Sequence, residues 1–131
     1  MNLQSSKKRS YAQSLGIKLT KFDSGFAETI LEVQSHMVNA YGTVHGAVIY
    51  ALADHAFSVA CNAYGKTSLG LSTTIQFIES AQPGDKIVAC ATEVKRNYRT
   101  GFYRIDVLHE QNLIATMEAV SYRKDQYFIK F

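Results

Sequence analysis

The sequence is poor in the residues that mark several other protein classes. Its 131 residues include two cysteines, one proline and no tryptophan, and charged residues make up only 19%, with a net charge of +3. Cys61 and Cys90 lie in separate apolar stretches, which indicates reduced core residues and not a disulfide. The sequence has no C-x-x-C motif and no cluster of histidines and cysteines, so nothing in it indicates a metal site. We expect a single domain over residues 1–131.

Long apolar runs and strong charge clusters are also missing. The longest apolar run, residues 47–53, stops at Asp54 and is far shorter than the about 18 residues of a membrane span. Residues 1–10 are polar and lack the apolar centre of a signal peptide. The basic residues are too scattered for a nucleic-acid-binding face. We therefore expect a cytoplasmic protein with no membrane and no nucleic acid as partner.

Hydrophobic residues make up 47% of the chain, which is typical of a globular domain. We expect a lead-in over residues 1–22 that is helical around 8–15, and alternation over 26–36 predicts a strand. A loop over 37–44 precedes an almost wholly apolar segment from 44 or 45 to 63. This segment predicts a helix of about five turns that is apolar almost all round and therefore largely buried.

Only strand patterns follow that helix. They cover residues 68–79, 86–97, 102–109 and 113–124, with a turn at Pro83-Gly84-Asp85, a short connection near Thr100 and a hairpin turn at Gln111-Asn112. We expect a meander that follows the helix. The order of elements predicts an α+β domain in which an antiparallel sheet wraps around one long buried central helix.

The start of the long helix carries a pattern that indicates chemistry. His45 and Gly46 stand at its mouth, and Asp54 lies about two turns inside it. A helix N-terminus offers unpaired N–H groups and partial positive charge, which suit a carbonyl oxygen gaining negative charge. A carboxylate in an apolar helix costs free energy unless it is used or paired. Gly46 is thus a candidate electrophile through its N–H, and Asp54 a candidate general base or nucleophile.

Each of these residues also has a purely structural interpretation. Gly46 could simply let the loop and the helix pack closely, and Asp54 could lie on a solvent-facing stripe, although its neighbours are apolar. His45 could orient the loop or donate to a substrate oxygen. Asn39 could position the attacking water or the substrate carbonyl, or could be an ordinary loop residue.

The order of elements, together with Asn39-x-x-Gly42-x-x-His45-Gly46 and Leu52-Ala53-Asp54, resembles the hotdog fold. More closely, residues 26–123 resemble the phenylacetic-acid-degradation (PaaI-like) family of acyl-CoA thioesterases. The resemblance implies hydrolysis of an acyl- or aryl-acyl-CoA to free acid and coenzyme A. It also implies homodimers that pair into tetramers. Coenzyme A would then be part of the substrate, and no separate cofactor or metal is expected.

The sequence departs from the family pattern at two places. Ala47 stands where the motif usually has a second glycine. Some relatives also carry a serine early in the following strand, and that place falls near Gly70, with Ser68 and Ser72 as its neighbours. The effect of Ala47 and the role of a strand hydroxyl are therefore open.

Helix geometry adds an expectation about assembly. Gly46 and Asp54 are eight residues apart, which is about 12 Å along a helix axis. A base must lie within about 3 Å of the group on which it acts. One thioester therefore cannot use both residues of the same helix. Two antiparallel helices would bring Gly46 of one chain towards Asp54 of the other, so we expect active sites shared across a twofold dimer interface.

Coenzyme A would bring anionic phosphates to the site. Lys95, Arg96 and Arg99 cluster near a strand turn and are candidate phosphate partners, or else solvated turn charges. Two other functions stay open. A protein that binds acyl-CoA without cleaving it is compatible with Ala47. A hotdog hydroxyacyl-CoA or hydroxyacyl-carrier-protein dehydratase would use a loop histidine and a helix acid, but the proline-rich loop of that group is absent.

Overall fold

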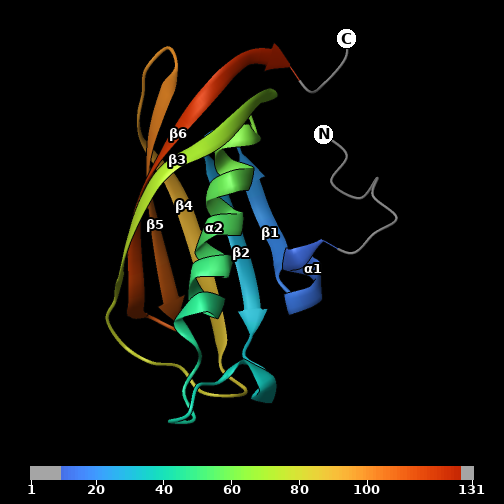
Figure 1. Ribbon diagram of the computed structural model, residues 1–131, viewed down its shortest axis with the longest axis vertical. Coiled ribbons are helices and arrows are strands. Elements are labelled where there is room, and N and C mark those ends of the chain that lie inside the picture. Colours follow the sequence, from blue (N-terminus) through green and yellow to red (C-terminus); the bar gives the residue numbers. More distant parts are fainter. Residues whose placement is uncertain (1–9, 128–131) are drawn as a thin grey trace.

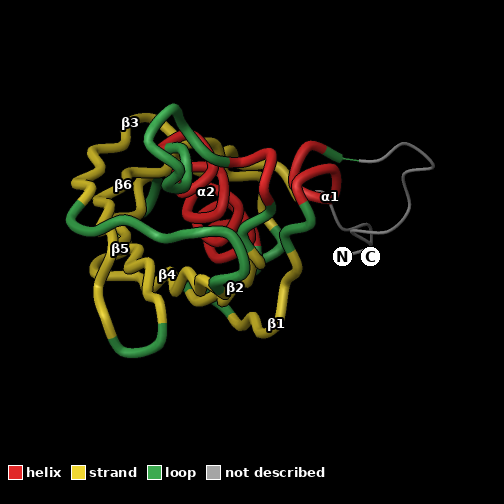
Figure 2. Tube along the Cα trace, turned by 90° about the horizontal axis from the view of Figure 1, so that it is seen from below, coloured by secondary structure: helices red, strands yellow, loops and turns green. Residues whose placement is uncertain are grey.

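The computed structural model describes residues 10–127, and the side chains of residues 10–124. Its elements follow in the order α1 (Tyr11–Leu15), β1 (Lys18–Asp23), β2 (Phe26–Glu32), the 3-10 helix η1 (Ser35–Met37), α2 (Gly46–Asn62), β3 (Lys66–Phe77), β4 (Lys86–Arg96), β5 (Thr100–His109) and β6 (Asn112–Tyr127). All strand pairs are antiparallel, and the sheet order is β1-β2-β4-β5-β6-β3. Helix α2 lies along one face of this sheet (Figure 1), and the strands curve around it (Figure 2). The predicted α+β hotdog arrangement is confirmed.

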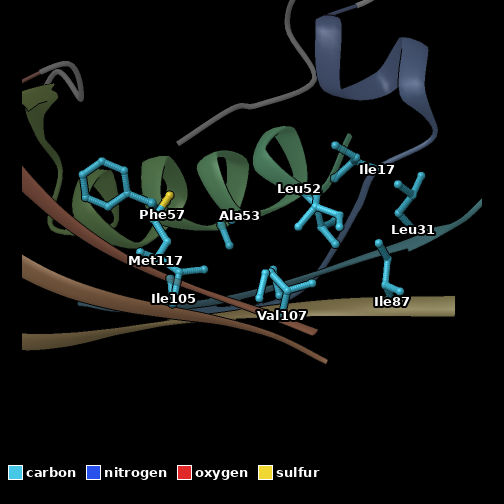
Figure 3. Close-up of a cluster of buried hydrophobic side chains, with 14 of the residues drawn as sticks. Ile17, Leu31, Leu52, Ala53, Phe57, Ile87, Ile105, Val107 and Met117 are labelled. Atoms are coloured by element: carbon cyan, nitrogen blue, oxygen red, sulfur yellow. The ribbon is translucent and has the colours of Figure 1, made fainter. Parts of the chain in front are cut away.

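The hydrophobic core fills the space between α2 and the inner face of the sheet. Leu52, Ala53 and Phe57 of α2 are at most 2% exposed and face buried side chains of the strands (Figure 3). Burial alternates along β2, as predicted from its sequence, and inner residues such as Ala27 and Thr29 are fully buried. The sheet therefore holds α2 firmly along one side. Both cysteines are free, as predicted.

The strand content differs from the sequence prediction at the edges of the sheet. The segment Lys18–Asp23, predicted as part of the lead-in, is an edge strand, β1. Its side chains are mostly exposed, so it carries no hydrophobic alternation that could have revealed it. Strand β2 ends at Glu32 because the chain then turns into η1. The hairpin turn between β5 and β6 lies one residue earlier than predicted, at Glu110-Gln111.

Strand β3 also has an unexpected place. It does not continue into a four-stranded meander but pairs with β6 at the far edge of the sheet, so the meander consists of β4, β5 and β6. The other edge of β3 has no strand beside it among the described residues. A long edge strand with exposed apolar side chains such as Leu71 and Phe77 is a surface on which another chain can pair.

One side of α2 is uncovered in the single chain. Ala47, Asp54 and Ser58 are exposed, and Tyr50 and Ala51 are half-buried. Their spacing of three and four residues places them on one stripe of the helix. The prediction of a largely buried helix holds for the side that faces the sheet, and the opposite side stays open in the single chain because one sheet layer covers one side only. None of the described helices has the length and apolar character needed to cross a membrane.

Candidate active site

The first turn of helix α2 has one backbone N–H donor without an acceptor among the described residues. His45 is the N-cap, and its own N–H donates to the Met37 carbonyl oxygen at 2.8 Å. The Ala47 N–H donates to His45 Nδ1 at 3.0 Å, and the Val48 N–H to the His45 carbonyl oxygen at 2.9 Å. The Gly46 N–H has no acceptor among residues 10–127. It is therefore the first-turn donor open to an oxygen brought by a ligand.

The cap gives His45 a structural role that the sequence left open. Because its Nδ1 accepts the Ala47 N–H, the neutral imidazole carries its proton on Nε2. The side chain is exposed, so Nε2–H remains able to donate to a neighbouring group. His45 thus fixes the start of the helix and leaves the adjacent Gly46 amide uncovered.

Asn39 organises the loop before the helix. Its Oδ1 accepts the Tyr41 N–H at 2.9 Å, and its Nδ2 donates to Thr43 Oγ1 at 3.0 Å. Its backbone N–H also donates to the Thr43 carbonyl oxygen at 2.8 Å, and Gly42 turns with a φ of +80°. Both ends of the amide are therefore engaged within the loop, which holds His45 and Gly46 in place.

Gly46 lies against an aromatic ring of strand β3. A Cβ added at this position would lie 3.2 Å from Phe77 Cζ and 3.3 Å from Cε1. This is tighter than ordinary van der Waals contact, so any side chain here would have to displace the ring. The structural and the functional interpretations of Gly46 hold together: the glycine permits close packing, and its N–H stays free.

Asp54 lies in an open groove along the uncovered side of α2. The groove has a volume of about 520 Å³, and its walls come from α2 and the start of α1, namely Ser10, Tyr11, Ala12, Ala47, Tyr50, Ala51, Asp54, His55 and Ser58. The Asp54 carboxylate has no hydrogen bond or ion pair within residues 10–127. Partial burial raises the pKa of this carboxyl above its ordinary value, and nearby His55 lowers it to a smaller extent.

The expectation that Asp54 is enclosed by apolar neighbours is corrected by this geometry. The side chain is exposed in the single chain because Leu52 and Ala53 point to the sheet while Asp54 points away from it. Burial also lowers the pKa of His55, so this residue tends towards the neutral form. Asp54 is consequently an accessible carboxylate without a fixed partner, which is what a general base or nucleophile requires.

Three contacts show that β3 runs antiparallel along α2. A Cβ at Gly70 would lie 3.3 Å from Phe57 Cε2, near the end of the helix. The Thr73 hydroxyl lies 2.9 Å from the hydroxyl of Tyr50, which is in the second turn of the helix. Phe77 packs against Gly46 at the start of the helix. Strand β3, whose outer edge is unpaired, therefore runs beside α2 (Figure 1).

Of the three residues near the expected strand serine, Ser68 and Gly70 are packed within the chain and Ser72 lies at the surface. Ser68 is buried, and both its N–H and its carbonyl oxygen bind the Asn62 side chain. Gly70 packs against Phe57, and Ser72 is exposed. The β3 hydroxyl that reaches α2 is that of Thr73. Sequence reasoning missed Thr73 and its partner Tyr50, since nothing in the sequence pairs the two.

The three basic residues lie at the other end of the helix from Gly46. Lys95 and Arg96 end β4, and Arg99 lies in the β4–β5 hairpin. Arg96 Cζ is 3.8 Å from the ring centre of Tyr64, which follows α2. The 17 residues of α2 span about 25 Å, so one chain does not bring these cations near its own Gly46.

Comparison with known proteins now defines the class. Residues 41–116 match the Thioesterase superfamily, and the chain is 33% identical over 113 residues to the acyl-coenzyme A thioesterase PaaI of Escherichia coli, covering 86% of this chain and 81% of that protein. The chain therefore belongs to the thioesterase superfamily. Its predicted family and its identity as an enzyme of the thioester-hydrolase type are confirmed.

Two solved structures give the same result. The E. coli PaaI protein from the phenylacetic acid degradation operon superposes with a TM-score of 0.86 and 32% identity, covering 88% of this chain and 85% of that one. The TT0310 protein of Thermus thermophilus gives a TM-score of 0.84 and 33% identity, covering 87% of this chain and 97% of that one. The likeness thus extends over nearly all of the described fold, including α2 and β3.

Proposed function

We propose that this protein hydrolyses acyl-CoA thioesters at a site built from two copies of the chain. The Gly46 N–H of one subunit would donate to the thioester oxygen, and Asp54 of the partner subunit would act on the attacking water or attack the carbonyl directly. The observation that carries the proposal is that α2 holds two polar groups without partners among the described residues, the Gly46 amide donor and the Asp54 carboxylate. The name of the E. coli relative, an acyl-coenzyme A thioesterase, supports the substrate class.

In the general-base form, the steps balance as an ordinary hydrolysis. Asp54 takes a proton from water, the water oxygen bonds to the thioester carbon, and negative charge moves onto the carbonyl oxygen. The Gly46 N–H and the positive end of α2 stabilise that charge. The C–S bond then breaks, the coenzyme A thiolate leaves and takes up the proton held by Asp54, and the acid is released with the carboxylate of Asp54 restored. A thiolate is a good leaving group, so one carboxylate and one strong donor are a sufficient minimum.

A twofold pairing of chains would complete this site. If Gly46 faces Asp54 of the partner, the symmetry axis passes near residue 50, halfway between them. The β3 residue that contacts Tyr50 is Thr73, close to the middle of the unpaired edge strand. Leu69, Leu71 and Phe77 of β3 are 48%, 61% and 54% exposed in the single chain. Pairing of two β3 edges about this axis would cover apolar surface and align the helices antiparallel.

The same pairing would place the basic residues usefully. The β4–β5 hairpin of one chain would project beyond Gly46 of the partner, so Lys95, Arg96 and Arg99 could bind the phosphates of coenzyme A. We propose a homodimer with two such sites, able to pair further into a tetramer. Dehydration is disfavoured as an alternative because His45 Nδ1 already caps the helix.

The direct test is thiol release from a panel of acyl-CoA esters by the wild type and by Asp54→Asn. Loss of the general base should lower kcat by at least about a hundredfold, whereas Glu118→Gln, which makes the same kind of change at an exposed position of β6 away from the groove, should keep most of the activity. Turnover by Asp54→Asn near that of the wild type would remove Asp54 from the mechanism. Binding of acyl-CoA with no release of thiol by the wild type would favour a non-hydrolytic binding protein.

A further inference from the structure

The line that joins the two proposed reacting groups on α2 passes through Tyr50. Gly46, Tyr50 and Asp54 follow each other at intervals of four residues, which turns each about 40° from the last on the helix surface. Tyr50 is therefore one turn from each group. It is half-buried and forms part of the wall of the groove that holds Asp54.

The Tyr50 hydroxyl is held by strand β3. It lies 2.9 Å from Thr73 Oγ1, and either oxygen can be the donor. Thr73 is also half-buried, and no other side-chain hydrogen bond within residues 10–124 involves either hydroxyl. The contact fixes the Tyr50 side chain against the edge strand, so its hydroxyl has a defined position beside Thr73, while Tyr50 also contributes to the wall of the groove.

The hydroxyl pair has one proton more than its own hydrogen bond uses. Each hydroxyl carries one donor proton and can accept as well. If Thr73 donates to Tyr50, the Tyr50 proton is free, and if Tyr50 donates to Thr73, the Thr73 proton is free. In either arrangement the pair therefore keeps one free donor proton, besides lone pairs that can accept. A phenylalanine and a valine of similar shape would fill the same space without offering this donor.

We propose that Tyr50 and Thr73 form a donor subsite that binds an oxygen atom of the thioester substrate a few bonds from the reacting carbonyl. This inference rests on the proposed function, because it takes Gly46 and Asp54 as the groups on either side of the thioester. The ligand chemistry is a neutral oxygen acceptor. Its source is either a substituent of the acyl chain or the pantetheine amide nearest the sulfur. The subsite makes Tyr50 a specificity-determining residue.

The test compares Tyr50→Phe and Thr73→Val with matched controls. Tyr122→Phe and Thr74→Val make the same chemical changes at exposed positions away from the groove, and Thr73→Ser restores a hydroxyl. The first substrate pair is 3-hydroxybutyryl-CoA and butyryl-CoA, which differ in an acyl oxygen. The second is the N-acetylcysteamine and the S-ethyl thioester of butyrate, which differ in the amide. Melting temperatures check folding, and kcat/KM is measured for all four.

Loss of one neutral hydrogen bond should change a kcat/KM ratio by about three- to tenfold. The first ratio is kcat/KM for 3-hydroxybutyryl-CoA over that for butyryl-CoA. If this ratio falls in Tyr50→Phe and Thr73→Val and recovers in Thr73→Ser, the result supports the subsite and assigns the acyl oxygen. The second ratio is kcat/KM for the N-acetylcysteamine thioester over that for the S-ethyl thioester. A fall of this ratio supports the subsite and assigns the amide. If neither ratio changes by more than in the two controls, the pair only ties helix to strand and the proposal is overturned.

Binding measurements separate this proposal from the hydrolytic one. The affinities of 3-hydroxybutyryl-CoA, butyryl-CoA and the two short thioesters are measured by calorimetry in the Asp54→Asn background, with and without Tyr50→Phe. A change of the affinity ratio within either pair supports the subsite even if the wild type releases no thiol, in which case only the proposed hydrolysis fails. Unchanged ratios in both pairs overturn the subsite while leaving hydrolysis to be judged by Asp54→Asn alone.

Discussion

Replacing Gly46 by proline removes the backbone N–H of this residue, and it does so at a helix position that accommodates proline. Gly46 is the first helical residue after the N-cap His45, and proline is favoured there because its fixed φ suits the first turn. The residue before a proline must be extended, and His45 already is, with φ −68° and ψ 138°. No hydrogen bond within residues 10–127 is lost, since the Gly46 N–H has no acceptor among them.

The magnitude follows from the role that we assign to this amide. Removal of one donor from an oxyanion site lowers kcat by about a hundred- to a thousandfold, so Gly46→Pro should lose that much of its turnover. Gly46→Ala is the matched control. It adds the same Cβ, which would lie 3.2 Å from the exposed Phe77 ring, but keeps the N–H. We expect it to retain far more activity than the proline variant.

We would measure thiol release by both variants and check their folding by melting temperature. The comparison distinguishes loss of the N–H donor from crowding against Phe77. A KM that stays near the wild-type value while kcat falls would locate the loss in the transition state. Equal losses in Gly46→Ala and Gly46→Pro would mean that crowding against Phe77 explains the defect. Full activity of Gly46→Pro would refute the assignment of Gly46 as the oxyanion donor.

Two further predictions concern charge. Because partial burial raises the pKa of Asp54 above its ordinary value, and His55 lowers it to a smaller extent, activity that needs the carboxylate should appear as pH rises through this raised pKa. His55→Gln removes the group that lowers the pKa of Asp54, so the acidic limb of the kcat profile should move to higher pH. A limb that stays in place or moves to lower pH would contradict this prediction. Arg99→Ala should raise KM for acyl-CoA about tenfold but not for an N-acetylcysteamine thioester, which has no phosphates. Arg104→Ala, on the outer sheet face, is the control, and an equal rise for both substrates would deny Arg99 the phosphate role.

The long helix and the core strands could be predicted because burial leaves a periodic pattern in the sequence. Strand β2 alternates, and the apolar segment from 44 or 45 to 63 gave α2 nearly to the residue. Strand β1 could not be found in this way, because an edge strand with exposed side chains has no such pattern. The place of β3 beside β6 depends on long-range pairing, which local spacing does not encode.

The candidate site was predictable only as far as its residues lie on one helix. Gly46 and Asp54 follow from a motif and from helix geometry, and the structure adds what surrounds them. The use of the His45 ring as a cap and of the Asn39 amide inside its own loop depends on side-chain positions. The exposure of Asp54 was mispredicted, because the alanine-rich sequence around it is compatible with a buried helix face and with an uncovered one.

The central claim is that Gly46 and Asp54 act together across two subunits, and a complementation measurement tests it most directly. Asp54→Asn and Gly46→Pro are co-expressed in equal amounts, and thiol release is compared with that of each variant alone. Random pairing makes about half of the dimers mixed, and each mixed dimer has one intact site of two if the sites are shared. The account predicts about a quarter of wild-type activity. A mixture no more active than the separate variants, although mixed dimers form, would contradict it.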